Sequence, residues 1–153
     1  MLKLDQTDRT LLMLLQNDSK QTTKELSNKL HLSVTAVYER IKKLEKEGII
    51  KNYVAILDKK KIEKSFLAHC HVRLTQHSKD FVIKFEREII KLEEVLECYH
   101  ISGDYDYILK IVVNDMDAYR DFMITKLTAI PNIGNTHSIF VIGEVKHTTA
   151  ISV

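Results

Sequence analysis

The sequence predicts an α+β chain of two modules, three helices followed by elements in the order strand, helix, strand, strand, helix, strand. Apolar residues recur at helical spacing up to about residue 47, and they alternate with a period of two from Ala68 onward. Charge divides near the same place. Residues 1–61 carry 13 Lys and Arg against 8 Asp and Glu, whereas residues 62–153 carry 10 against 13. Such asymmetry favours a basic nucleic-acid-binding module joined to a second, acidic module.

The composition is that of an ordinary folded protein. With 44% hydrophobic and 29% charged residues and one Pro, the chain is neither disordered nor collagen-like. No apolar run approaches the roughly 20 residues of a transmembrane helix, and the N-terminus lacks a signal-peptide pattern. We therefore expect a cytoplasmic protein with no membrane partner. Cys70 and Cys98 lack metal or redox spacing, so we expect both to be reduced and buried.

The first helix is expected over about 6–16. Asp5 is a good N-cap, and a stripe of leucines follows it. Thr22 and Glu25 form a capping box that begins a second helix, which ends near His31. Ser33 then caps a third helix, over about 34–47, and Gly48 stops it.

Two short helices joined by a tight turn, the second longer and more basic, indicate a helix-turn-helix. Val37, Ile41 and Leu44 turn one face of the third helix into the core and leave the opposite face free. The residues expected at DNA, on base edges or phosphates, are Thr22, Thr23, Ser33, Thr35, Ala36, Tyr38, Glu39, Arg40, Lys42 and Lys43. Replacing Arg40 is expected to weaken DNA binding with almost no change in melting temperature. The alternative for this face is a solvated charged surface.

The second module begins after residues 49–57, a β-branched stretch that predicts an extended linker strand. The expected domains are 1–60, winged or three-helix, and 61–153. The elements predicted for the second domain are a strand from Ala68, a helix over about 79–92, strands over 95–101 and 107–113, a helix capped by Asp115, and a strand over about 136–147. This order is the ferredoxin-like, split βαβ plan. Because the last strand is apolar on both faces, we expect another subunit to cover the open sheet face.

This combination resembles the Lrp/AsnC (feast/famine) family of transcriptional regulators over essentially the whole chain. The matching motifs are Leu4-Asp5-x-x-Asp8, Leu32-Ser33-x-Thr35-x-Val37-x-x-Arg40-Ile41-x-x-Leu44-Glu45-x-x-Gly48 and Ser102-Gly103-Asp104-Tyr105-Asp106-Tyr107. Val34 stands where family members often have Pro.

The resemblance implies a homodimer, assembling to tetramers or octamers, that binds double-stranded operator DNA. It also implies a free amino acid as effector, held where C-terminal domains meet. The implied effector residues are Gly103, Asp104, Tyr105 and Asp106, with Thr136, His137 and Ser138 contributed by a neighbouring subunit. From turn chemistry alone, an ordinary hairpin turn is the favoured interpretation of the Gly103 loop, because Gly and Asp are the usual turn residues.

Other chemistries find little support. His69 and His71 have a chelating spacing but no evident third ligand, so we expect no metal and no cofactor. Motifs of hydrolases, nucleotide-binding loops and zinc peptidases are absent, so we expect no catalytic residues and no enzyme. Two alternatives stay open. One is a ligand-blind architectural DNA organiser; the other is an enzyme similar to siroheme decarboxylases, in which His69, His71, His100 or His137 faces a tetrapyrrole.

Overall fold

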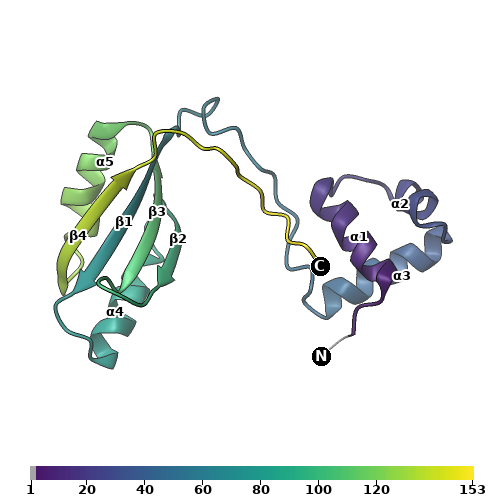
Figure 1. Cartoon of the computed structure of the whole chain (residues 1–153), viewed down its shortest axis with the longest axis horizontal. Coiled ribbons are helices and arrows are strands. Elements are labelled where there is room, and N and C mark those ends of the chain that lie inside the picture. Colours follow the sequence, from purple (N-terminus) through teal and green to yellow (C-terminus); the bar gives the residue numbers. More distant parts are fainter. Residues whose placement is uncertain (1–2) are drawn as a thin grey trace. The chain divides into compact units, whose positions relative to one another are not determined.

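The computed structural model describes residues 3–153 and divides into two compact units (Figure 1). The three-helix unit comprises the chain up to Ile56 together with Val145–Val153. The sheet unit comprises Leu57–Glu144. Residues 1 and 2, which begin the N-terminal segment considered for a signal peptide, lie outside the described part. Among residues 3–153, no helix is long and apolar enough to cross a membrane.

The three-helix unit contains α1 (Gln6–Asn17), α2 (Thr23–Leu30) and α3 (Val34–Lys46), as predicted. The predicted caps form: Asp5 and Thr22 each begin a capping box, and the Ser33 hydroxyl accepts the Ala36 N–H. His31 closes α2 in a left-handed conformation (φ 53°). Gly48 follows α3 with φ 69°, a value that glycine adopts without strain.

The core of this unit is a leucine cluster on the inner faces of the helices. Its buried members are Leu11, Leu12, Leu15, Leu26, Val37 and Leu44. Because Val37 and Leu44 bury one face of α3, the opposite face is left exposed. This confirms the predicted orientation of the helix.

The prediction of a strand over 49–57 is wrong. These residues form no ladder with any part of the described chain, and their side chains are almost all exposed. A β-branched stretch favours extended backbone, but a strand exists only where a neighbour supplies hydrogen bonds. The segment is therefore an unpaired linker.

The sheet unit follows the predicted order. Its elements are β1 (Phe66–Leu74), α4 (Lys79–Ile89), β2 (Val95–His100), β3 (Tyr107–Val113), α5 (Met116–Phe122) continued by the π-helical η1 (Met123–Leu127), and β4 (Ile133–Phe140). The strands lie side by side in the order β2-β3-β1-β4, all neighbours antiparallel (Figure 1). The ferredoxin-like prediction is thus confirmed.

The last strand begins and ends earlier than predicted. Leu74 at the end of β1 already pairs with Ile133, and Val141 donates a final hydrogen bond to the Leu67 carbonyl. Beyond that point β1 supplies no further partner, because it begins at Phe66. Residues 141–147 are apolar enough for a strand, but they have nothing to pair with.

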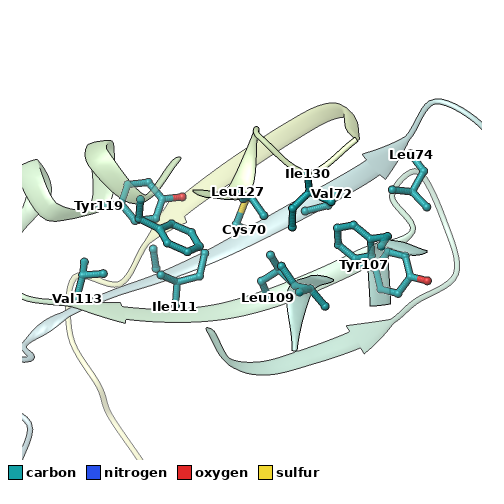
Figure 2. Close-up of a cluster of buried hydrophobic side chains, with 14 residues drawn as sticks. Cys70, Val72, Leu74, Tyr107, Leu109, Ile111, Val113, Tyr119, Leu127 and Ile130 are labelled. Carbon is teal, nitrogen blue, oxygen red and sulfur yellow. The ribbon is translucent and has the colours of Figure 1, made fainter. Parts of the chain in front are cut away.

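Both helices contribute buried side chains to one core on the sheet, part of which Figure 2 shows. Cys70, Val72, Tyr107 and Leu109 project from the strands toward Leu127 and its neighbours. Both cysteines are free, but only Cys70 is fully buried; Cys98 is half-buried, contrary to expectation. Burial still raises the pKa of the Cys98 thiol to about 11, which disfavours the thiolate form at neutral pH.

Candidate DNA-binding surface and effector loop

The outward face of α3 is polar and cationic. Its exposed side chains are Thr35, Tyr38, Glu39, Lys42, Lys43 and Lys46. Lys42 pairs with Glu45 at 2.9 Å, and its Nζ lies 5.8 Å from the centre of the Tyr38 ring. Within residues 3–153, Lys43 and Lys46 form no ion pair, so their ammonium groups are available to an external anion.

The N-cap hydroxyls of α2 and α3 already make hydrogen bonds within the chain, so only part of their bonding capacity is free for DNA. The Thr22 hydroxyl accepts the Glu25 N–H and donates to the Glu25 carboxylate at 2.8 Å, so its donor is used. The Ser33 hydroxyl accepts the Ala36 N–H at 3.1 Å, which leaves its own hydrogen free to donate. Thr23 and Ala36 are half-buried beside these caps.

Arg40 has a role that the sequence did not indicate. Its Nη1 donates to Asp5 Oδ2 at 2.8 Å and to Asp8 Oδ1 at 2.6 Å. Asp8 is only 4% exposed, and its carboxylate also accepts the Asp5 N–H. Arg40 therefore fastens α3 to the N-terminus of α1. The expectation that its removal leaves stability unchanged conflicts with this geometry, because a nearly buried carboxylate loses its cation.

The capping carboxylates make the three-helix unit sensitive to acid. The Asp8 N–H and then the Arg40 guanidinium hold the pKa of Asp5 below its usual 3.8, and bonds from Thr22 hold that of Glu25 below 4.5. A pKa that is lower in the folded state adds stability above the unfolded value, and that stability is lost as pH falls through the folded value. We expect melting temperature to decline below about pH 4.5. The decline is smaller in Asp5→Asn, which thermal melts from pH 6 to pH 2.5 test.

The hairpin loop between β2 and β3 has a defined shape. Gly103 adopts φ 116°, and the Ile101 N–H donates to the Asp106 carbonyl at 2.8 Å. The Asp106 carboxylate, largely shielded, accepts the Leu74 N–H at 2.7 Å and contacts His77 Nε2 at 2.7 Å. Arg73 Nε donates to the Asp104 carbonyl at 2.6 Å. Asp106 thus shapes the loop, whereas the Asp104 carboxylate is exposed and makes no hydrogen bond in the described chain.

Tyr105 turns from this loop onto the open face of the sheet. Its ring centre lies 5.4 Å from that of His71 and 6.2 Å from that of His137, with the Arg73 guanidinium 5.6 Å away. His71 and His137 are directly paired across β1 and β4. Tyr105 of the loop and His137 therefore lie in one cluster within this chain, whereas the resemblance implied that His137 contacts the effector from a neighbouring subunit.

The other two predicted residues of β4 lie on the opposite face. The Ser138 hydroxyl lies 2.6 Å from the Tyr119 hydroxyl, on the helix-covered side, and Thr136 shares that side because alternate residues of a strand do. Sequence reasoning did not place His71, Arg73 or His77 beside the loop. His71 and Arg73 had only the alternation along β1 as a signal, and His77, which follows β1, had none.

The four histidines considered for a tetrapyrrole do not gather in one place. His69, His71 and His137 lie on the open face, whereas His100 stacks on buried Tyr107 at 4.7 Å. In residues 3–153, no group of three or more His, Cys, Asp or Glu side chains is placed to hold a metal ion.

Family models match both parts of the chain. Residues 4–51 match a winged helix-turn-helix DNA-binding domain, and residues 67–151 match the Lrp/AsnC ligand-binding domain. The chain belongs to the Lrp/AsnC family. This Lrp/AsnC protein is therefore a DNA-binding transcriptional regulator with a ligand-binding domain.

Named relatives agree with this assignment. The leucine-responsive regulatory protein of Escherichia coli is 36% identical over 148 residues, which are 97% of this chain and 90% of that protein. A transcriptional regulator of Neisseria meningitidis, solved as a complex with L-methionine, superposes with a TM-score of 0.93 at 33% identity, over 97% and 96% of the two chains. An AsnC family regulator of Agrobacterium tumefaciens also gives 0.93, at 34% identity and the same coverage.

Proposed function

We propose that this Lrp/AsnC protein is a cytoplasmic, sequence-specific transcriptional regulator whose DNA binding responds to a free amino acid. The observation that carries the proposal is the exposed tip of the loop, residues 102–104, where the space around Gly103 and the Asp104 carboxylate are open to a small zwitterion. The similar regulator of Neisseria meningitidis, solved with L-methionine, supports the choice of ligand class.

An amino acid presents a carboxylate and an ammonium group. Gly103 has no heavy atom within 4 Å of where a Cβ would lie, so the ligand carboxylate can approach backbone N–H groups there. The Asp104 carboxylate pairs with the ammonium. Tyr105 and His137 then flank the ligand side chain, and we assign no ligand contact to Thr136 or Ser138, which lie across the sheet.

DNA is read by the outward face of α3. Thr35, Tyr38 and Glu39 supply groups that reach base edges, and Lys42 and Lys43 supply cations for phosphates. Arg40 holds α3 against the N-terminus of α1 through its bonds to Asp5 and Asp8. Each base contact contributes about 1–3 kcal/mol, so one unit alone gives limited specificity.

Two such units in a dimer read half-sites about 34 Å apart. The open sheet face supplies a surface for dimerisation, since Tyr99 is 56% and Ile139 46% exposed there. We propose a homodimer that assembles further to a tetramer or octamer.

Lys43→Ala is expected to weaken DNA binding by about tenfold at low salt, because one phosphate contact and its released counterion are lost. The slope of log affinity against log salt falls in magnitude by about 1. Fluorescence anisotropy across salt concentrations measures both. The control is Lys79→Ala, which removes an exposed lysine from the sheet unit. Equal losses in the two variants contradict the assignment of Lys43.

The proposed function is tested in two steps. The first is selection of duplexes from a random-sequence library by the wild-type protein; enrichment of one motif supports sequence-specific binding. The second is the melting temperature with each of the twenty amino acids at millimolar concentration, where a ligand at a hundredfold excess over Kd adds about 2.7 kcal/mol. No enrichment and no shift favour an architectural DNA organiser instead.

A further inference from the structure

The C-terminal segment Val145–Val153 returns to the three-helix unit after the chain has completed the sheet unit. The chain therefore passes between the two units twice, once after Ile56 and once after Glu144. A protein of two units joined by one linker needs only one such passage. The second passage depends on the contacts that hold residues 145–153 on the three-helix unit.

The side-chain amide of Gln16 fixes the returning segment. Its Nε2 donates to the Ile151 carbonyl at 2.9 Å, and its Oε1 accepts the Ile151 N–H at 2.7 Å. One side chain thus satisfies both backbone groups of one residue, as a neighbouring strand does. Gln16 lies in the last turn of α1, whose other face carries core residue Leu15.

The contact between Gln16 and Ile151 is weak enough to break and re-form. Ile151 is 72% exposed, and both hydrogen bonds lie in solvent, so water replaces either of them at small net cost. The part of the segment before it, residues 142–150, is exposed throughout. The segment therefore has two accessible states: closed, with Ile151 bonded to Gln16, and open, with both hydrogen bonds broken.

At its other end the segment follows β4, from which it is separated only by residues 141–144. β4 carries His137 beside Tyr105 and ends at Phe140, and Glu144 then forms an ion pair with Lys59 at 2.6 Å. Lys59 belongs to the start of the sheet unit, just after the linker. The two passages therefore leave the sheet unit from one place, and β4 joins the ligand loop to the second passage.

We propose that Val145–Val153 is a second, releasable tether, closed by Gln16, through which the effector loop controls the freedom of the DNA-binding helices. Closed, it restricts the motion that the exposed linker over 51–57 permits. Open, the three-helix unit moves on one linker alone. The role in effector response rests on the proposed function; the tether itself does not.

The first experiment tests the tether without any effector, on the full chain. Hydrogen exchange is measured at the Ile151 amide in the wild type, in Gln16→Ala and in the control Asn17→Ala, whose side chain makes no hydrogen bond in the described chain. We expect exchange to rise at least about tenfold in Gln16→Ala only, with faster proteolysis of the 51–57 linker. Gln16→Glu, which keeps the acceptor for Ile151 N–H, gives an intermediate rate. Equal exchange in all four proteins overturns the tether.

The second experiment tests transmission, using the selected duplex and L-methionine as probe, followed by the other amino acids. In the wild type the effector changes DNA affinity within the usual range of about 5- to 150-fold, and in Gln16→Ala the change falls to within about twofold of none. Deleting residues 150–153 gives the same loss. An undiminished response overturns transmission. No response in the wild type to any amino acid refutes the proposed sensing, and the exchange result still decides the tether.

Discussion

Replacing Arg40 with alanine lowers the stability of the three-helix unit by about 2 kcal/mol, which corresponds to a fall in melting temperature of roughly 10 °C for a unit of this size. The reason is the Asp8 carboxylate, which is 4% exposed and receives the guanidinium at 2.6 Å. Without Arg40 that charge stays nearly buried with no cation. Calorimetry of the full chain, with hydrogen exchange in α1 and α3, measures the loss.

A double-mutant cycle separates this effect from loss of packing. Arg40→Ala combined with Asp8→Asn is expected to be more stable than Arg40→Ala alone by about 1 kcal/mol, because the unpaired charge is gone. Lys46→Ala removes a cation from the exposed face of α3 and serves as the matched control, with an unchanged melting temperature. A variant Arg40→Ala that melts with the wild type refutes the structural role of this side chain.

Replacing Asp106 with alanine destabilises the sheet unit by about 2 kcal/mol and abolishes the effector response. Its carboxylate accepts the N–H of Leu74, a residue that is 2% exposed, so the substitution leaves a shielded donor without an acceptor. The loop also loses its contact with His77. Calorimetry with and without the amino acid found by the melting screen measures both losses.

Two further variants show which aspartate binds and which one shapes the loop. Asp106→Asn keeps an acceptor for Leu74 N–H and is expected to regain most of the stability. Asp104→Ala keeps wild-type stability, because the side chain is exposed and unbonded, but loses the thermal shift caused by the amino acid. If Asp104→Ala retains that shift, the carboxylate is not the ammonium partner.

The helices and strands were largely predictable because their signals are local. The capping residues Asp5, Thr22 and Ser33 begin their helices, and alternation from Ala68 to Leu74 marks a strand with one buried face. The errors came where a strand depends on its neighbour. Residues 49–57 and 141–147 have strand composition, but no partner runs beside them.

The exposure of part of the predicted DNA-binding face was predictable for the same reason. Exposure of Tyr38, Lys42 and Lys43 follows from the helical period around Val37 and Leu44. The order of residues within one strand did not show which residues they contact. His137 lies beside Tyr105 on the open face of the sheet, and the Ser138 hydroxyl contacts that of Tyr119 on the helix-covered face. The pairing of β4 with β1 settles those positions, and it joins residues that are distant in sequence, such as His71 and His137.

The sequence alone thus predicted the family, the helix boundaries and the cationic face of α3, because residue spacing and helix capping act over a few residues. The Arg40 contact with Asp8, the hydrogen bond from the Leu74 N–H to the Asp106 carboxylate, and the return of Ile151 to Gln16 emerged only from the folded chain. Each of these joins groups that are distant in sequence, and nothing in either local stretch encodes the partner.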